Sequence, residues 1–484
     1  MNPRETRMAT ANIPSLILRM SLPMVISMLV LALYNVVDSV FLSMTPEGDS
    51  YLAALSLAFP FQMLTVGIGI GTAVGTCSLV SRKLGEGDRL GADMTATNGM
   101  MLAFLSGLVT LAVGLTLSGA CIGIVNGQGG NVSDATLAYG TDYLRICMSF
   151  SMFLMIQAMS EKLLQSCGHM VLAMLTQIAG AVVNIVLDPI LIFGLLGFPA
   201  MGVKGAAIAT VAGQFVGMLL GFMLMRGHAT VKLRFTVQAE VDGRARRRLF
   251  KPSGSIVRGI YAVGLPSIVM QSIGSVTNLC MNSILVTFSE SAVTVLGLYF
   301  KIHSFVFMPV FGLNSGTMPI LAYNYGAGNG VRVKKTLYTG ICYALVVMLA
   351  GFALFQLMPQ QLLSLFNVGD EIMRIGTQAF RTISICFPFA GICIMCGTLF
   401  QAIGKGVFSL AVTACRQLIV IIPAALILAT VTKDVMAVWY AYPLAEIMSL
   451  SVSLIFVTRT IRRNINNLKP RTEDNILNAP VESA

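Results

Sequence analysis

Long apolar runs, separated by short polar segments, dominate the hydrophobic pattern along the whole chain. Each run has at least the roughly 20 residues that an α-helix needs to cross a hydrocarbon core of about 30 Å. The pattern therefore predicts twelve membrane-spanning helices. They cover residues 13–43, 51–81, 93–118, 137–160, 170–196, 204–225, 259–288, 293–323, 336–357, 372–400, 408–430 and 436–458.

The composition supports an all-α, multi-pass membrane protein. Of the 484 residues, 56% are hydrophobic and 11% are charged, and the mean hydropathy is +0.80. Soluble domains usually carry about 25% charged residues. No cleavable signal peptide is expected, because the first apolar run is too long for one and lacks a small-residue cleavage site.

Positive charge is concentrated in alternate loops. If the N-terminus is cytoplasmic, the cytoplasmic segments hold 25 of the 32 Lys and Arg residues, Lys162 among them. The opposite loops clearly hold only Lys204 and Lys433. This asymmetry follows the positive-inside rule and predicts two cytoplasmic termini. The net charge of +11, including the basic stretch RARRRLFK (244–251), is thus a topology signal. Contact of this basic stretch with acidic lipids is a second interpretation. No nucleic-acid partner is expected.

The second half of the chain repeats three sequence blocks of the first half in the same order. SLPMVIS (21–27) matches 264–270, residues 54–89 match 295–330, and LLQSCGH (163–169) matches 399–405. The repeat predicts two six-helix lobes with the same orientation, typical of transporters that rock two halves around a substrate. The predicted parts are a cytoplasmic tail (1–12), an N-lobe (13–225), a cytoplasmic basic linker (226–258), a C-lobe (259–458) and a second cytoplasmic tail (459–484).

Proline occupies corresponding positions in the first helix of each predicted lobe, at Pro23 and Pro266. Because proline removes a backbone hydrogen bond, both residues are expected to bend their helices.

Several motifs together resemble the multidrug and toxic compound extrusion (MATE) family. They are YNVVDSVFL (34–42), ALSLAFPF (54–61), SRKLGEGD (81–88), QSCGH (165–169), NIVLDPILIF (184–193), YNYGAGN (323–329) and QAIGKG (401–406). The resemblance covers residues 13–458 and is greatest for the bacterial MepA-like branch. It implies a transporter of the bacterial cytoplasmic membrane that exports small-molecule drugs or toxic organic cations. The transporter is expected to bind a coupling ion but no cofactor. Its expected partners are membrane lipids. No obligate protein partner is expected, so the chain is expected to be a monomer.

The carboxylates of Asp38 and Asp188 lie inside predicted spans of the N-lobe, in otherwise apolar stretches. Asp38 is placed roughly 9 Å below the outer boundary and Asp188 roughly 13 Å below it, at a rise of 1.5 Å per residue. A carboxylate at the centre of a membrane helix costs about 2.5–3.5 kcal/mol on insertion scales, so it is usually retained for a use. Helical spacing of i, i+7 and i+11 adds further polar residues to the faces of Asp38 and Asp188. These are Ser27, Tyr34, Gln177 and Asn184.

The two carboxylates predict a cation-coupling site. A carboxyl group in a poorly hydrated site can take up a proton at the outer face and release it at the inner face. Alternatively, the carboxylates and neighbouring Asn and Thr oxygens could bind Na⁺, and the sequence does not choose between the two ions. A purely structural alternative is that Asp38 caps or pairs with a basic group and that Asp188 satisfies backbone freed by Pro189. The family resemblance assigns the coupling role to Tyr34, Asp38, Asn184, Asp188 and Thr210.

The internal repeat provides a comparison for this site. At the repeat offsets, Asp38, Asn184 and Asp188 correspond to Met281, Val420 and Ala424, so the second half has lost these groups. The loss favours a specialised cation site in the N-lobe. The spans at 259–288 and 372–400 contain no carboxylate, so the C-lobe Na⁺ site of another family branch is not expected.

Candidates for the substrate cavity occur in both halves. Flexible Met side chains can adapt to differently shaped ligands, although ordinary packing is the alternative for each of them. The C-lobe Lys301 could organise a counter-carboxylate or a water network, whereas His303 could equally be a hydrogen-bonded core residue. The candidates are Met155, Gln157, Met174, Gln177, Asn278, Asn282, Lys301 and His303.

These inferences predict a secondary active multidrug antiporter, driven by inward H⁺ or Na⁺, rather than an enzyme. A lipid-linked saccharide flippase of related architecture is an alternative, although such proteins often have more helices and a strongly basic cavity. An intramembrane enzyme is less expected, because it would need a reactive cluster such as HExxH or GxSxG, and the histidines at 169, 228 and 303 are scattered over different segments. No phosphate-binding GxxxxGK[ST] loop occurs, so transport is not expected to need a nucleotide. Cys393 and Cys396 form a CxxC without nearby His or acidic ligands, so no metal site is expected.

Overall fold

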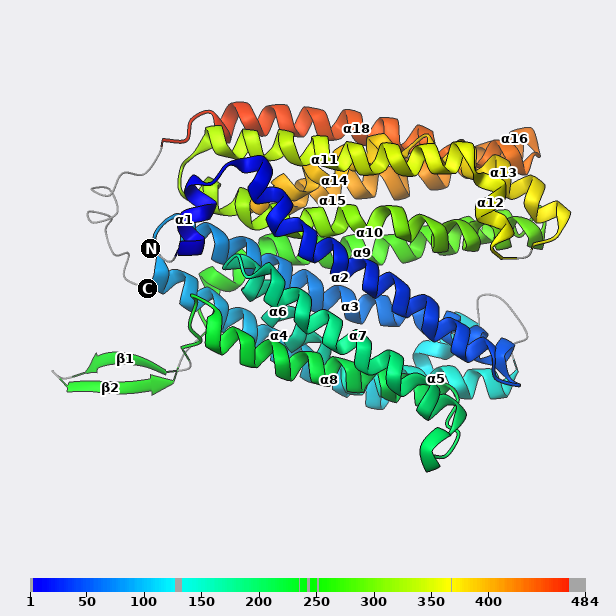
Figure 1. Ribbon diagram of the computed structural model, residues 1–484, viewed down its shortest axis with the longest axis horizontal. Coiled ribbons are helices and arrows are strands. Elements are labelled where there is room, and N and C mark those ends of the chain that lie inside the picture. Colours follow the sequence, from blue (N-terminus) through cyan, green and yellow to red (C-terminus); the bar gives the residue numbers. More distant parts are fainter. Residues whose placement is uncertain are drawn as a thin grey trace.

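The computed structural model describes residues 3–126, 133–234, 236–241, 244–249, 252–366 and 368–469 as a bundle of long helices (Figure 1). The first half of the chain contains α1 (Pro3–Thr10), α2 (Ile13–Ser43), α3 (Gly48–Gly85), α4 (Arg89–Asn126), α5 (Asp134–Ser149), α6 (Ser151–Ser166), α7 (Met170–Phe193), the 3₁₀ turn η1 (Leu195–Gly197) and α8 (Val203–His228).

The second half begins after two short strands, β1 (Thr236–Val241) and β2 (Arg244–Leu249). Its helices are α9 (Gly254–Leu285), α10 (Glu290–Gly326), α11 (Gly330–Leu357), α12 (Pro359–Ser364), α13 (Asp370–Ser384), α14 (Phe387–Ala402), α15 (Gly406–Ala414), the π-helix η2 (Cys415–Ile421), α16 (Ile422–Thr432), α17 (Val435–Val438), α18 (Ala441–Thr460) and the π-helix η3 (Ile461–Ile465).

The number of membrane spans agrees with the sequence pattern. Within the described chain, ten helical segments are long and apolar enough to cross a membrane, and two bent helix pairs, α5 with α6 and α13 with α14, bring the number to twelve. Each pair is bent by 47°, and each forms the fourth span of its half. The internal repeat is therefore seen in the bend of this span as well as in the sequence. The predicted all-α fold with two six-helix lobes is confirmed. Pro23 and Pro266 lie inside α2 and α9, which continue through them, and their bending role stays a prediction.

The two lobes meet through four central helices. Figure 1 shows α2, α3, α9 and α10 between the outer helices of the two lobes, with α3 packed on α9 and α2 packed on α10. A methyl group on Gly85 would overlap the carbonyl oxygen of Tyr323, and one on Gly326 would overlap the carbonyl oxygen of Arg82. The two contacts are related by the 241-residue offset of the repeat, so α3 and α10 cross symmetrically at their C-terminal ends.

Hydrogen bonds join the lobes at the end of the molecule where α1 lies and where α18 and η3 end, which we call the inner end (Figure 1). The Ser78 hydroxyl of α3 donates to the carbonyl oxygen of Gln401 in α14 at 2.6 Å. Arg332 of α11 donates to the carbonyl oxygens of Met8 and Ala11 at 3.1 and 2.9 Å. The predicted N-terminal tail thus contains α1, and its Met8 is buried against the C-lobe. The lobes are closed together at the inner end.

The predicted basic linker contains an antiparallel hairpin that pairs Thr236 with Leu249 and Val241 with Arg244. Figure 1 shows the hairpin projecting from the helices at the inner end. These strands were not predicted, although the Asp-Gly pair at 242–243 is a strong hairpin signal. They are the non-helical exception to the all-α prediction.

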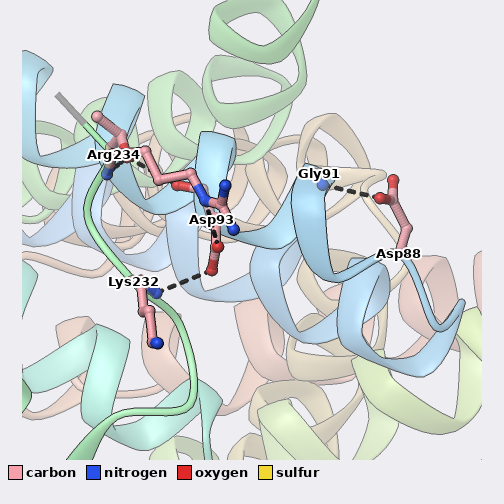
Figure 2. A network of polar contacts seen from close by, with 6 residues as sticks. Asp88, Gly91, Asp93, Lys232 and Arg234 are labelled. Carbon is pink, nitrogen blue, oxygen red and sulfur yellow. Dashed lines mark hydrogen bonds and ion pairs between the residues drawn. The ribbon is translucent and has the colours of Figure 1, made fainter. Parts of the chain in front are cut away.

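The linker is attached to the N-lobe on both sides of this hairpin. Figure 2 shows Asp93 of α4 accepting the backbone N–H of Lys232 at 2.8 Å and the Arg234 side chain at 2.8 Å. Farther along α4, Asn98 accepts the backbone N–H of Ser253 at 3.1 Å. The covalent connection between the lobes is therefore tied to α4 before it enters α9.

Candidate functional site

The two polar faces predicted on α2 and α7 face each other. The Ser27 hydroxyl on α2 donates to the side-chain oxygen of Gln177 on α7. Because Tyr34 and Asp38 share the face of Ser27, and Asn184 and Asp188 share the face of Gln177, the same contact directs both sets toward one helix interface. The structure thus brings together polar groups that are about 150 positions apart in the sequence.

A third helix, α8, completes the site. The Asn184 amide lies 3.4 Å from a carboxylate oxygen of Asp188 and 3.4 Å from the Thr210 hydroxyl of α8. Helices α7 and α8 approach closely because Gly180 and Gly213 face each other, and a methyl group on Gly213 would lie 2.5 Å from the Gly180 carbonyl oxygen. Asp188 is completely buried at this junction.

Three side-chain oxygens in this region are buried without a hydrogen-bond partner among the described residues. They are one carboxylate oxygen each of Asp38 and Asp188 and the amide oxygen of Asn184. Buried polar atoms are normally paired, and each unpaired one costs about 1–3 kcal/mol. Three unpaired acceptors from one set of facing side chains are the arrangement expected where a proton or a small cation is taken up.

The electrostatic surroundings agree with this interpretation. Asp38 and Asp188 lie close enough to repel each other, and Tyr34 lies within the field of both carboxylates. Within the described chain, neither carboxylate forms an ion pair, and Asp188 is hydrogen-bonded by Asn184 rather than by backbone near Pro189. The purely structural alternative therefore finds no basic partner or cap. We call Tyr34, Asp38, Asn184, Asp188 and Thr210 the outer site.

The outer site has oxygen chemistry suited to H⁺ or Na⁺. Where the structure describes the chain, no three His, Cys, Asp or Glu side chains come together to hold a metal ion. The side chains that could bind a cation here offer two carboxylates and neutral amide and hydroxyl oxygens. Alkali cations prefer such hard oxygen ligands over soft sulfur or imidazole. A proton shared by two close carboxyl groups would satisfy the same oxygens.

The N-lobe cavity candidates have different surroundings. Met155 is fully buried and packs against Gly69 of α3, which favours the packing interpretation for this residue. Gln157 donates to Glu161 at 3.0 Å, and its amide is pressed against Gly217 of α8. Gln177 receives the hydrogen bond from Ser27, and Met174 is half-buried on the same helix.

The C-lobe cavity candidates differ in exposure and surroundings. Lys301 is exposed, whereas His303 is half-buried among aromatic rings, stacking on Phe307 with ring centres 3.8 Å apart. Tyr299 also lies beside His303, at 5.1 Å between ring centres. His303 is therefore a member of an aromatic core. Asn278 and Asn282 are half-buried on α9.

A buried ion pair in the C-lobe was missed by the sequence analysis. Arg416 in the π-helix η2 lies 3.3 Å from one carboxylate oxygen of Glu446 in α18 and 3.4 Å from the other. The Glu446 side chain is 5% exposed and the Arg416 side chain 24%. Both residues lie inside predicted spans. Because charged residues inside a span are costly and usually paired or functional, their positions in the sequence could have indicated this pair.

Another buried carboxylate of the N-lobe, Glu161, was also missed. The predicted span ended at residue 160, whereas α6 continues to Ser166 and buries Glu161 between α6 and α7. Lys162, which was counted among the cytoplasmic loop charges, is likewise inside α6. An error of a few residues at a helix boundary concealed an ionisable group inside the lobe.

A family model described as MatE matches residues 23–190 and 266–427. This chain belongs to the MatE family. The multidrug export protein MepA of Staphylococcus haemolyticus is 25% identical over 408 residues, covering 84% of this chain and 85% of MepA. A protein named FAD transporter, from Shewanella oneidensis, is 26% identical over 417 residues, covering 86% of this chain and 88% of the relative.

Solved structures agree with the two-lobe fold. One described as the outward-facing conformation of a multidrug resistance MATE family transporter has a TM-score of 0.85 and 26% sequence identity, covering 95% of this chain and 98% of the other. As a MatE member the chain is a transporter and not an enzyme, so the enzyme alternative is excluded. The resemblance to the MepA-like branch is confirmed.

Proposed function

We propose that this MatE transporter exports cationic or amphiphilic organic compounds by antiport, driven by inward H⁺ or Na⁺ bound at the outer site. The observation that carries this proposal is the set of three buried, unpartnered oxygens on Asp38, Asn184 and Asp188. A transporter that must bind and release a cation needs acceptors that its own side chains leave free.

The chemistry of the cycle follows from the repulsion between the two carboxylates. A proton or Na⁺ between Asp38 and Asp188 removes the repulsion and lets α2 and α7 draw together. Its release restores the repulsion and favours their separation. In this proposal Asn184 and Thr210 supply further oxygens, and Tyr34 adds a hydroxyl beside both carboxylates.

Helix α2 provides a physical connection from this site to the lobe interface. It contacts α7 on the polar face and α10 of the C-lobe through Ser21, whose hydroxyl donates to the Leu313 carbonyl oxygen at 3.4 Å. A change in the position of α2 therefore acts on both contacts, and alternating access by rocking of the two lobes follows. A unit charge moving through 100 mV supplies about 2.3 kcal/mol for the cycle.

The natural setting is part of the same proposal. We expect a monomer in a bacterial cytoplasmic membrane with both termini cytoplasmic, which places the inner end inside the cell. The relative named FAD transporter supports a second candidate substrate class, an anionic flavin dinucleotide, which the same assay can include.

The test is efflux of ethidium from energised or inverted vesicles with an imposed pH or Na⁺ gradient. The wild type is expected to respond to one of the two gradients. Asp38→Asn and Asp188→Asn are expected to lose gradient-driven efflux, because a neutral amide neither binds a proton nor attracts a cation. FAD is tested in parallel as the competing substrate.

Asp142→Asn provides a matched control. Asp142 lies in α5 and pairs with Lys204 at 3.0 Å, outside the outer site. This variant is expected to pump like the wild type. A wild type that ignores both gradients contradicts antiport, and full activity in both outer-site variants contradicts the assignment of the carboxylates.

A further inference from the structure

Glu161 is a buried carboxylate at the opposite end of the N-lobe from the outer site. It lies five residues before the end of α6 at Ser166, and it is 5% exposed. Glu161 takes part in none of the contacts described for the outer site. A buried carboxylate is costly unless a partner neutralises it, so its surroundings decide what it can do.

Two neutral side chains hold Glu161. Its Oε1 atom accepts hydrogen bonds from the Gln157 amide at 3.0 Å and from the Thr176 hydroxyl at 3.3 Å. The Gln177 side chain lies near the same carboxylate. Within the described chain no basic group forms an ion pair with Glu161, so the carboxylate is oriented but not neutralised.

The neighbouring Lys162 does not fill that role. Its ammonium group donates to Gln165 at 2.8 Å and to the Ser315 hydroxyl of α10 at 3.4 Å. Lys162 is the charged group that acts on Glu161, and Cys77 of α3 is an ionisable group beside Lys162. From the other packed helices, Glu161 meets Thr176 and Gln177 of α7, while Gly217 of α8 lies against Gln157.

Glu161 and the outer site are linked through α7, which carries Thr176 beside Glu161 and Asn184 and Asp188 in the outer site. Gln177, which follows Thr176 on α7, accepts the hydrogen bond from Ser27 on the α2 face of Asp38. Along α7, Thr176 and Asp188 are about 18 Å apart at a rise of 1.5 Å per residue. Asp188 lies toward the outer boundary and Thr176 toward the closed inner end.

The contact between Lys162 and Ser315 crosses from the N-lobe to the C-lobe. If the lobes separate at the inner end, this contact breaks, and water reaches the end of α6. The surroundings of Glu161 therefore change with the same motion that alternating access requires.

We propose that Glu161, held by Gln157 and Thr176, is a second, inner binding site for the coupling cation, from which the ion leaves at the inner face. For H⁺, the Glu161 carboxylate accepts a proton that has left the outer site and releases it to water when the inner end opens. For Na⁺, the Glu161 carboxylate and the Thr176 hydroxyl supply oxygen ligands. This inference rests on the proposed antiport.

The test uses the purified full chain in liposomes and separates coupling from substrate handling. Gradient-driven ethidium transport is compared with gradient-free ethidium exchange for the wild type, Glu161→Gln, Glu161→Asp and Asp38→Asn. Couplings between sites typically change affinity by about 5–150-fold, so Glu161→Gln is expected to lower gradient-driven transport by at least about fivefold while exchange is retained. Glu161→Asp is expected to restore part of the coupling and to shift its pH or Na⁺ dependence.

Ser160→Ala is the matched control, because Ser160 is buried next to Glu161 and bonds only to the Ile156 carbonyl oxygen of its own helix among the described contacts. It is expected to behave like the wild type. Proton release to a pH-indicating dye when ethidium is added to detergent-solubilised protein, or Na⁺ release in the Na⁺ case, is an independent measurement. It is expected to fall in Glu161→Gln.

The results distinguish three cases. Normal gradient-driven transport in Glu161→Gln overturns the inner site, even if Asp38→Asn confirms the outer one. Equal loss of exchange and driven transport, without rescue by Glu161→Asp, assigns Glu161 a structural role and also overturns it. If the wild type responds to neither gradient, the proposed antiport fails together with the inference.

Discussion

In the C-lobe, Glu446 lies 3.3 Å from Arg416, whereas the N-lobe carboxylates Asp38, Asp188 and Glu161 form no ion pair within the described chain. Both lobes arose from one six-helix repeat, and both bury acidic groups. A carboxylate beside a guanidinium keeps its charge through a conformational cycle, because the partner stabilises that charge. An unpaired carboxylate can bind and release a cation. This contrast fits the proposed antiport, in which the unpaired N-lobe carboxylates exchange the ion, and it leaves the C-lobe pair as a constant polar contact.

The largest expected effect comes from breaking the C-lobe pair. Arg416→Met leaves the carboxylate of Glu446 buried without a partner, which is expected to destabilise the protein by about 3–5 kcal/mol. The double variant Arg416→Met/Glu446→Leu is expected to recover most of this loss, because it removes both charges. Thermal unfolding in detergent at neutral pH measures both effects.

Asp188→Asn is the N-lobe counterpart in the same unfolding experiment. It removes a buried charge that has no ionic partner, so we expect no comparable loss of stability. If Arg416→Met costs no more than Asp188→Asn, the difference between the lobes does not hold.

The second prediction tests the symmetric crossing at the inner end. Gly85→Val and Gly326→Val each place a side chain against a carbonyl oxygen of the other lobe, and overpacking typically costs about 1–3 kcal/mol. Both variants are expected to separate the lobes at the inner end and to increase hydrogen–deuterium exchange at the ends of α3 and α10. Ethidium efflux should fall in both.

Gly274→Val serves as the control, since a Cβ atom at Gly274 of α9 would meet no atom within 4 Å. It is expected to leave exchange and efflux unchanged. Because the two crossings are related by the repeat, a strong effect at Gly85 and none at Gly326 would contradict their equivalence.

The smallest expected effect concerns the contact between the two polar faces. Ser27→Ala removes the hydrogen bond from α2 to Gln177, at a cost of about 0.5–1.5 kcal/mol. Unfolding stability should fall by this amount, with a modest loss of gradient-driven efflux. Ser283→Ala is the control, because Ser283 is exposed and bonds to the Leu279 carbonyl oxygen of its own helix at 3.0 Å. A larger loss for Ser283→Ala would show that the α2–α7 contact is not special.

Helix boundaries and long-range partners limited what could be predicted for the candidate site. Asp38 and Asp188 were recognised because each stands alone in an apolar run, where its cost is plain from the sequence. Glu161 stands at the end of such a run, and an early predicted boundary assigned it to a loop. Arg416 and Glu446 are 30 positions apart, so nothing local indicates that they form a pair.

The sequence by itself determined the membrane class, the twelve spans, the two-lobe repeat and the loss of the outer-site residues from the second half. These properties follow from hydrophobic length and from comparison of the chain with itself, and neither requires knowledge of which helices touch. Tertiary structure alone decided that the face of Ser27 meets the face of Gln177, that Arg416 neutralises Glu446, and that Glu161 is hydrogen-bonded but has no ionic partner within the described chain. Those outcomes depend on which side of each helix packs against which neighbour, and the free energy of a buried charge is set by that neighbour.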